Sequence, residues 1–481
     1  MAGNFAASPT FSLQPSAQQV PLSTNYITNF DFLNQYLPDT YEKEFERYGN
    51  RTLSAFLKMV GAEMPSNSDL IKWAEQGRLH IKYENVTSAQ AAGSNTATLT
   101  VNDSAIGSNP VGTVITGENP YSAQGGIAVR KGQTVVISDN AGGGENKAVV
   151  TAVDTANSTF SVAYYEAAGQ VAALGAATTV FIYGSEFEKG KAGMEGSLQS
   201  DDYIFENNPI ILKDTYLVNG SDMAQIGWIE ISTEDGGSGY LWYLKSEHET
   251  RLRFDDYLET AMIEAVPAEA ASGAVGEGLI GSEGVFHAVG TRGNLWTGGN
   301  PDALADFDAV IDRLDKQGAI EENVIFLNRQ FGFDIDDMLA AQNSYGAGGT
   351  SYGLFDNDEE MALNLGFTGF RRGYDFYKSD WKYLNDPTMR GGISGTGAIN
   401  GLLVPAGSTS VYDQVLGKNA KRPYLHVRYR ASETEDRRYK TWITGSAGGA
   451  ATTDIDEMRV NFLSERCVCV MGANNFVLFE D

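Results

Sequence analysis

The glycine-rich segments are the first candidates for nucleotide chemistry. The run Gly276–Gly281 matches G-x-G-x-x-G, which binds a dinucleotide only when a strand precedes it and a helix follows it. Neither pattern flanks this run. A second run, Gly346–Gly353, lacks the Gly-Lys-Ser/Thr ending that a phosphate-binding loop requires. We therefore expect a connector at the first run and a polar, mobile loop at the second.

Acidic and histidine side chains offer no better site. One acidic cluster resembles a calcium-binding ladder but lacks the central glycine and the spaced final glutamate. No G-x-S-x-G pattern places a nucleophile at a strand-to-helix turn, and the histidines are too far apart in sequence to suggest a general base. We predict that the chain is not an enzyme and that it has no catalytic residue, metal site or cofactor. The residues concerned are Asp356, Asp358, Glu359 and Glu360, and His80, His248, His287 and His426.

The two cysteines, Cys467 and Cys469, stand two residues apart in a strand-like run. Their side chains would point to the same face of a strand, where such closely spaced cysteines make a poor disulfide. Zinc would need further ligands, and no second cysteine pair or histidine cluster supplies them. We predict two reduced, buried thiols on one strand face, which fits a reducing cytosol.

The net charge of the chain restricts its partners. Its 62 acidic and 35 basic residues give a formal net charge of −27. A surface this acidic repels phosphate, which argues against a dedicated DNA- or RNA-binding role without excluding a place beside DNA. With 481 residues and 42 % hydrophobic content the chain can build several cores. We expect neither a membrane span nor secretion, because no long apolar run and no basic, apolar leader is visible.

One long amphipathic stretch, residues 240–266, stands out among strand-like segments and glycine-rich loops. Glycines precede it and Pro267 closes it. Its polar residues cover much of the circumference, so the pattern fits both a strut that neighbouring subunits touch and an ordinary surface helix. Acid-then-base pairs four residues apart support the helix: Glu247 with Arg251, and Glu249 with Arg253.

The segments before the long helix divide into an arm, some helices and a β-rich block. Residues 1–24 should form an extended arm, and apolar spacing predicts helices at 26–37, 41–60 and 67–76, then a strand at 78–83. From residue 86 to 184 Ala, Thr, Gly, Val and Asn dominate, as in a small all-β sandwich or barrel inserted into a host domain. Its expected strands are 97–101, 113–116, 133–138, 148–153, 159–165 and 178–183.

Residues 186–216 are charged and interrupted by glycines, which predicts a long two-stranded arm. Lys189, Lys191 and Lys213 stand among acidic residues, so the arm should be flexible in a monomer. Tyr203, Ile204 and Phe205 would be its apolar anchors on a neighbour.

The second half of the chain predicts an α/β or α+β subdomain followed by strands. The best-capped helix runs from Asn300, as N-cap, to Gly318, with Pro301 in its first turn. The further expected elements are a strand at 324–327, a helix at 334–343, and strands at 374–378, 401–404, 424–429, 458–463 and 467–470. The last of these should form a hairpin with 476–479.

The order and texture of these segments resemble the major capsid protein of tailed double-stranded DNA phages, with the Hong Kong 97-type shell fold. The segments concerned are PIILKDTYLVNGSDMAQIGWIE (209–230), GFRRGYDFYKSDWKYLNDPTMRG (369–391) and GLLVPAGSTSVYD (401–413). More narrowly, the chain is similar to the capsid proteins of crAss-like phages of gut Bacteroides. The likeness covers residues 25–85 and 186–481.

The resemblance implies an α+β fold built from an arm, two domains and a loop that reaches a neighbour. The β-rich block is absent from the minimal fold and would be an inserted domain. The implied parts are an N-terminal arm (1–40), a peripheral domain with the spine helix (41–85, 218–294 and 411–481), the inserted domain (86–184), an extended loop (185–217) and an axial domain (295–410).

The resemblance also implies a function and partners. The chain would be a structural protein that forms hexamers and pentamers of an icosahedral head around packaged double-stranded DNA, in the virion, after assembly in the bacterial cytoplasm. The portal and scaffolding, decoration or head-fibre proteins would be its other partners, and no membrane would be involved. The expected assembly contacts are Lys189, Lys191, Glu195, Tyr203, Phe205, Glu247, Arg251, Arg253, Gly346, Gly348 and Gly349.

Two other classes of protein stay open. A phage tail tube or sheath protein would share the acidity and β content, although the strut helix followed by an α/β subdomain counts against it. A carbohydrate-binding or hydrolytic surface protein would explain the Thr- and Asn-rich β block. The missing leader and the missing pair of catalytic acids count against that class.

Overall fold

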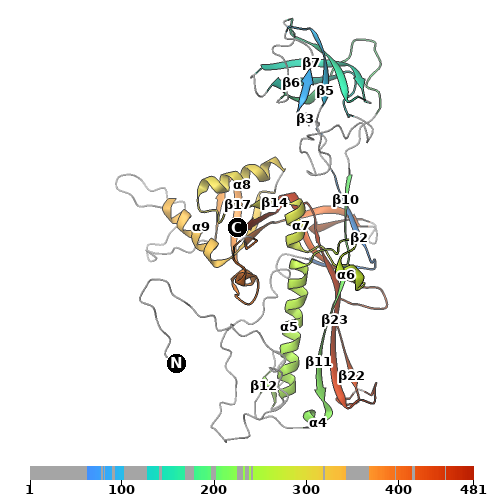
Figure 1. The fold of residues 1–481 in the computed structure, drawn as a ribbon, viewed down its shortest axis with the longest axis vertical. Helices are drawn as coiled ribbons and strands as arrows, with labels where there is room; N and C mark the ends of the chain where they lie inside the picture. Colours follow the sequence, from blue (N-terminus) through green and yellow to red (C-terminus); the bar gives the residue numbers. More distant parts are fainter. Residues whose placement is uncertain are drawn as a thin grey trace. The chain divides into compact units, whose positions relative to one another are not determined.

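The computed structural model divides the chain into two compact units (Figure 1). We call Lys72–Phe205 the β unit, and Met1–Ile71 together with Glu206–Asp481 the host unit. The described residues are 62–76, 80, 82–88, 93–101, 127–139, 144–155, 157–167, 169, 178–196, 202–224, 231–232, 238–239, 242–317, 320–342, 368–395, 397–413, 418–449 and 451–481.

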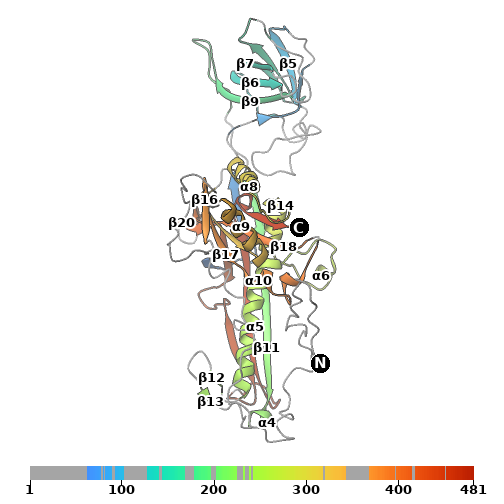
Figure 2. The same cartoon turned by 90° about the vertical axis from the view of Figure 1, so that its left-hand side faces the viewer.

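The β unit is a curved antiparallel sheet with its own core (Figure 2). Its seven strands follow the order β3-β9-β6-β7-β8-β5-β4. Alternate side chains such as Leu99, Phe160 and Val162 are buried, as expected for strands with one buried face. The strands are β3 (Lys82–Tyr83), β4 (Val86–Ser88), β5 (Thr96–Val101), β6 (Gln133–Asp139), β7 (Gly144–Asp154), β8 (Thr159–Tyr164) and β9 (Thr178–Ser185).

Most strands predicted for this block are confirmed; the one expected at 113–116 lies outside the described residues. The helix predicted at 67–76 is wrong. Residues Ile71–Gln76 form strand β2, which pairs with β10 (Asp202–Asn207). Burial alternates along β2 with the period of two that a strand requires, and so short a segment does not separate that period from a helical one. The helices predicted at 26–37 and 41–60 lie outside the described residues.

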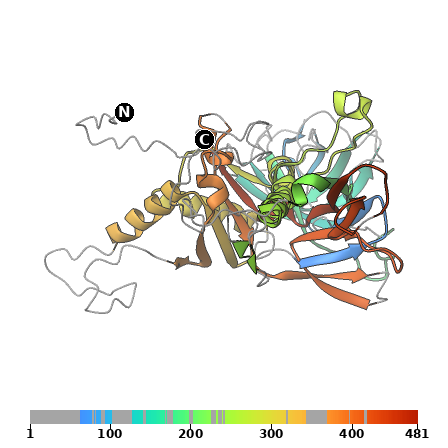
Figure 3. The same cartoon turned by 90° about the horizontal axis from the view of Figure 1, so that it is seen from below.

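A five-stranded sheet carries the longest strands of the host unit. Its order is β1-β21-β23-β11, and β22 also pairs with β23. Strand β11 pairs with β23 from Ile210 opposite Arg466 to Asn219 opposite Glu457. Helix α5 (Trp242–Glu264) lies along one face of this sheet, which confirms the long helix predicted at 240–266 (Figures 1 and 3). The strands are β1 (Ala62–Ser66), β11 (Ile210–Asn219), β21 (Leu425–Arg430), β22 (Lys440–Gly445) and β23 (Glu457–Val470).

A six-stranded mixed sheet forms the other layer of the host unit, in the order β14-β24-β18-β15-β17-β16. Helices α8 (Leu304–Lys316) and α9 (Arg329–Gln342) cover one face through a core that includes Phe307, Leu314 and Phe331. The strands are β14 (Asn294–Trp296), β15 (Glu322–Leu327), β16 (Gly369–Arg372), β17 (Tyr374–Asp380), β18 (Ile399–Pro405) and β24 (Val477–Glu480).

The two sheets share one apolar core, which we call the junction core. Phe326 and Leu402 of the six-stranded sheet enter it, as do Val468 of β23 and Met262 of α5. Helix α7 (Val285–Arg292) packs into it as well. The remaining short elements are α4 (Gly220–Met223), β12 (Ile231–Ser232), β13 (Ser238–Gly239), α6 (Gly273–Gly276), α10 (Lys382–Asn385), η2 (Arg390–Gly392), β19 (Ser408–Asp413), β20 (Lys418–Pro423) and η3 (Ala473–Asn475).

Two predicted pairings of neighbouring strands are wrong. Strand β23 does not form a hairpin with β24, because the left-handed Gly472 and the η3 turn direct the chain into the six-stranded sheet instead. The predicted two-stranded arm is also wrong, since β10 pairs with β2 and β11 pairs with β23. Both errors come from assuming that strands adjacent in sequence pair with each other.

The predicted cap of α8 is wrong as well. The helix begins at Leu304, and the Asp306 carboxylate accepts a hydrogen bond from the Ala303 amide at 3.2 Å. The side-chain nitrogen of Asn300 instead donates to Asp334 Oδ2 at 2.7 Å. The start of α8 is therefore tied to α9 by the residue expected to cap it.

Candidate assembly surfaces

One side of helix α5 packs against the five-stranded sheet. Phe254 and Leu258 pack with Met458, Val460 and Phe462 of β23 in a cluster that we call the spine core. The Phe254 and Phe462 rings stack with centroids 5.8 Å apart. Tyr257 faces away from this core and is 48 % exposed. The helix therefore stiffens the sheet while it keeps a solvent-facing side.

The charged residues predicted as contacts on α5 have different surroundings. Burial raises the pKa of Glu247, and the nearby charge of Arg251 opposes that shift. Arg251 also lies beside Tyr439, whose pKa rises to about 12, chiefly through burial. Arg253 is exposed. Within its own chain, Arg251 thus acts on neighbouring side chains, whereas Arg253 points to solvent.

A buried arginine links β23 to β1 within the five-stranded sheet. Arg466 Nη1 lies 3.4 Å from Glu63 Oε1. Its Nε donates to the Ser464 hydroxyl at 2.9 Å, and its Nη2 donates to the Arg438 carbonyl at 2.9 Å. Desolvation lowers the pKa of Arg466, yet these partners satisfy its donors. The network ties β1, β23 and the segment that leads into β22 together.

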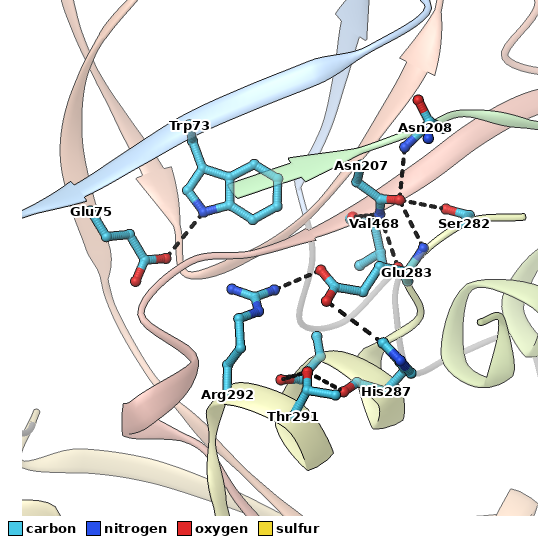
Figure 4. Close-up of polar contacts among 11 residues, drawn as sticks. Trp73, Glu75, Asn207, Asn208, Ser282, Glu283, His287, Thr291, Arg292 and Val468 are labelled. Carbon is cyan, nitrogen blue, oxygen red and sulfur yellow. Dashed lines mark hydrogen bonds and ion pairs between the residues drawn. The ribbon is translucent and has the colours of Figure 1, made fainter. Parts of the chain in front are cut away.

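Asn207 forms a second polar junction, where the chain enters β11 (Figure 4). Its side-chain nitrogen donates to the carbonyl oxygens of Glu283 at 2.9 Å and Val468 at 2.6 Å. Its side-chain oxygen accepts hydrogen bonds from the Asn208 amide, the Ser282 hydroxyl and the Glu283 amide. A buried amide with its donors and acceptor satisfied specifies one geometry. We call this group the Asn207 junction.

Glu283 extends the Asn207 junction to α7 (Figure 4). Its carboxylate lies 2.6 Å from Arg292 Nη2, with both side chains largely buried, and 3.6 Å from His287 Nδ1. A pair with so little solvent contact is screened less than a surface pair. The junction therefore holds both ends of α7 to the loop that precedes it.

No described helix or strand covers the face of the five-stranded sheet opposite α5, and we call it the outer face. Along β11, Ile211, Lys213, Thr215 and Leu217 are exposed, while the intervening residues turn toward α5. The register places Trp442 of β22 on the same face. An exposed face with Ile, Leu and Trp side chains is typical of an interaction surface.

Some of the assembly contacts predicted in the extended loop and the glycine-rich loop are described by the structure, and the others are not. Lys189, Lys191 and Glu195 are exposed in the β unit, where Lys191 Nζ lies 3.6 Å from Glu188. Phe205 contacts Trp73 within the β unit, with ring centroids 6.2 Å apart. The Tyr203 side chain and the loop glycines Gly346, Gly348 and Gly349 lie outside the described residues.

Two features of these surfaces, the Asn207 junction and the outer face, were not predicted from the sequence. The Asn207 junction joins segments that are distant in the chain, so no local sequence pattern indicates it. The outer face could have been found from the alternation in Ile210–Asn219, where apolar residues occupy both sides of the strand. The run Gly276–Gly281 follows the short helix α6, so it is not the strand–loop–helix that a dinucleotide site needs.

The two cysteines lie side by side on β23, opposite Arg428 and His426 of β21. Both are free and buried, which confirms the predicted burial on one strand face. A hydrogen bond with Cys469 and burial raise the pKa of the Cys467 thiol. A buried, protonated thiol is a poor nucleophile, so Cys467 contributes packing rather than reactivity. Cys469 is equally buried, which keeps reagents away from it.

Within the described residues, no cluster of three or more His, Cys, Asp or Glu side chains is arranged to hold a metal ion. In the same part of the chain, no helix is both long and apolar enough to cross a membrane.

No protein-family model and no curated protein matches the chain. A solved chain of Microbacterium phage Oxtober96 is similar at 10 % identity and a TM-score of 0.38, with 94 % of this chain and 99 % of that chain covered. A chain of the capsid of the native GTA particle gives 9 % identity, a TM-score of 0.36 and coverages of 93 % and 96 %. A chain of the bacteriophage PhiM1 mature capsid is similar at 9 % identity and a TM-score of 0.32, with 62 % of this chain and 78 % of that chain covered. Likeness at these TM-scores assigns neither a family nor a function to this chain.

Proposed function

We propose that this chain is a shell subunit that assembles with copies of itself into the icosahedral head of a tailed phage, with the Hong Kong 97-type architecture. Hexamers and pentamers would enclose double-stranded DNA. The narrower relation to crAss-like phages stays a prediction from the sequence.

The open outer face beside an open sheet edge carries the proposal. Strand β11 ends the described sheet, so one edge of a ten-residue strand has no paired neighbour among the described residues. Long open edges invite pairing with other chains, and monomeric proteins usually protect them. The outer face next to it exposes Ile211 and Leu217. Other copies of the subunit would bury such a face and such an edge, and this burial would stabilise the assembled form.

The charge of the chain supports the same role. A net charge of −27 repels packed DNA, so a shell of this protein would enclose phosphate without binding it tightly. The proposal needs no catalytic site and takes the chain's own copies as its main partner, with the portal and auxiliary head proteins as further partners.

The exposed charges of the extended loop would supply polar contacts at the rim of the interface. We infer that Lys189, Lys191 and Glu195 meet an adjacent subunit, with Arg253 of α5 at a second contact. Polar rims around apolar contacts are usual in protein interfaces. The variant Lys189→Glu/Lys191→Glu should weaken assembly, more strongly at low salt where charges are less screened.

Sedimentation of the purified chain tests the proposal. Wild-type protein should form particles of many copies, and the double lysine variant should form fewer of them with an unchanged melting temperature. Lys131→Glu/Lys147→Glu, on exposed lysines elsewhere in the β unit, is the matched control and should assemble normally. A chain that stays monomeric at all concentrations and salts would contradict the proposal.

A carbohydrate-binding role for the β unit is a second candidate. Tyr165, Phe181 and Tyr183 are exposed, and the Tyr165 hydroxyl donates a hydrogen bond to Glu186. Flat aromatic rings beside a carboxylate suit the apolar faces and hydroxyls of sugars. Binding on a glycan array that is lost in Tyr183→Ala would favour this candidate, and no binding would remove it.

A further inference from the structure

The segment between α5 and α7 closes on itself at its base. Pro267 pairs with Gly281 in an isolated bridge, and the Ala268 amide donates to the Ile280 carbonyl at 3.0 Å. Gly281 has φ +66°, and a Cβ there would lie 2.4 Å from the Val266 carbonyl oxygen. Only glycine fits this approach. We call residues 266–280 the apolar loop.

Internal hydrogen bonds give the apolar loop a fixed shape. Ser272 caps α6 by accepting from the Val275 amide, and the Leu279 amide donates to the Ala274 carbonyl at 2.9 Å. Its base is followed directly by Ser282 and Glu283, which Asn207 holds (Figure 4). A loop ordered before binding loses little conformational entropy when a partner arrives.

This ordered loop displays large aliphatic side chains to solvent. Val266, Val275, Leu279 and Ile280 are 57 %, 44 %, 62 % and 54 % exposed. Single exposed apolar residues are ordinary, but several on one short, ordered loop mark an interaction surface. Its charges are exclusively negative, from Glu269 and Glu277, and residues 254–291 contain no Lys or Arg.

The outer face of the five-stranded sheet has the complementary character. Its apolar side chains are Ile211, Leu217 and Trp442. Of its cations, Lys440 pairs with Glu435 at 2.6 Å and Arg459 with Glu457 at 3.0 Å, which leaves Lys213 for a partner. Lys440 Nζ lies 5.7 Å from the centre of the Trp442 ring. Lys213 is exposed and makes no ion pair with any described residue. An acidic, apolar loop and an apolar face with one cation unpaired among the described residues, Lys213, thus occur on the same chain.

We propose that the apolar loop of one copy docks on the outer face of the five-stranded sheet of a second copy. Leu279 and Ile280 would contact Ile211 and Leu217, and Glu277 would pair with Lys213. The contact is heterologous, since each copy contributes a loop to one neighbour and a face to another, which is how rings of subunits form. The inference rests on the proposed function, because it specifies how copies of the chain meet.

Loss of the apolar contact is the first test. Leu279→Ser/Ile280→Ser should raise the protein concentration needed for particle formation about tenfold or more, since two large apolar side chains lose their burial. The melting temperature of the monomer should not change, because both side chains are exposed. Phe333→Ser, which removes an exposed apolar side chain from α9, is the control and should assemble as wild type.

Charge exchange and cross-linking are the second test. Glu277→Lys and Lys213→Glu should each weaken assembly, and the double variant should recover it. Particles made from a mixture of Leu279→Cys and Leu217→Cys chains should form disulfide-linked dimers on oxidation, whereas each variant alone should not. If wild-type particles form but the serine variant assembles normally and no cross-link appears, the docking inference is wrong and the proposed function stands. If the wild-type chain never assembles, both are overturned.

Discussion

The side-chain amide of Asn207 donates a 2.6 Å hydrogen bond to the main-chain carbonyl of Val468, 261 residues further along the chain. The same amide group binds the loop that leads into α7. One buried side chain therefore holds three segments together: the start of β11, the end of the apolar loop and β23. The geometry of the outer face and of the apolar loop depends on this junction.

Asn207→Ala should lower the free energy of unfolding of the host unit by about 2–4 kcal/mol, because buried donors and acceptors lose their partners. Urea denaturation followed by tryptophan fluorescence measures this loss. The control is Asn208→Ala, which removes a neighbouring side chain that is only partly buried. Equal stability of both variants would show that the Asn207 bonds contribute nothing.

Glu247→Gln should change stability in a pH-dependent way. Burial raises the pKa of Glu247 above its ordinary value of 4.5, with Arg251 opposing. A raised pKa stabilises the fold fully below the unfolded pKa, and that contribution is lost as pH rises through the folded pKa. The variant should therefore be more stable than wild type at pH 7, by less than about 1 kcal/mol because the site is half open to solvent.

The difference between Glu247→Gln and wild type should shrink as the pH falls toward 4, which melting curves at several pH values would record. The exposed Glu195→Gln is the control, with no such trend expected. A variant that is less stable than wild type at pH 7 would mean that the attraction to Arg251 outweighs burial.

The thiols of Cys467 and Cys469 should be unreactive in the folded protein. Both are buried in β23, so a thiol reagent should label them only after unfolding. Cys467→Ala/Cys469→Ala should cost a few kcal/mol of stability, as core truncations do, without preventing assembly. Rapid labelling of the native protein, or stoichiometric bound zinc, would contradict the structural role.

The β unit should be removable. Replacing residues 77–201 with a Gly-Ser linker leaves β2 and β10 in place and deletes a sheet with its own core. The remaining chain should be soluble and should form particles, and the isolated β unit should unfold cooperatively. Insoluble protein from the deletion would show that the host unit needs the β unit in order to fold.

Local patterns in the sequence predicted local structure well. The long helix and most strands of the β block follow from periodicity and turn residues, since each depends on neighbours in the chain. The burial of Cys467 and Cys469 on one face follows from the two-residue repeat of a strand.

Long-range pairing could not be predicted in the same way. Strand β24 leaves β23 and joins β18 and β14, and β11 finds its partner at the far end of the chain. Nothing in the local sequence of β11 or β24 distinguishes these partners from nearer ones. The run Gly276–Gly281 was interpreted as a connector because no strand or helix pattern flanks it. The exposure of Leu279 and Ile280 depends instead on how Asn207 fixes the base of the apolar loop.

Electron microscopy of the purified full-length chain tests the central claim most directly. We expect closed, hollow shells of uniform diameter with icosahedral symmetry, in which density for β11 and α5 of one copy abuts a neighbouring copy. Open tubes with helical symmetry, or a field of isolated monomers under every assembly condition, would contradict it.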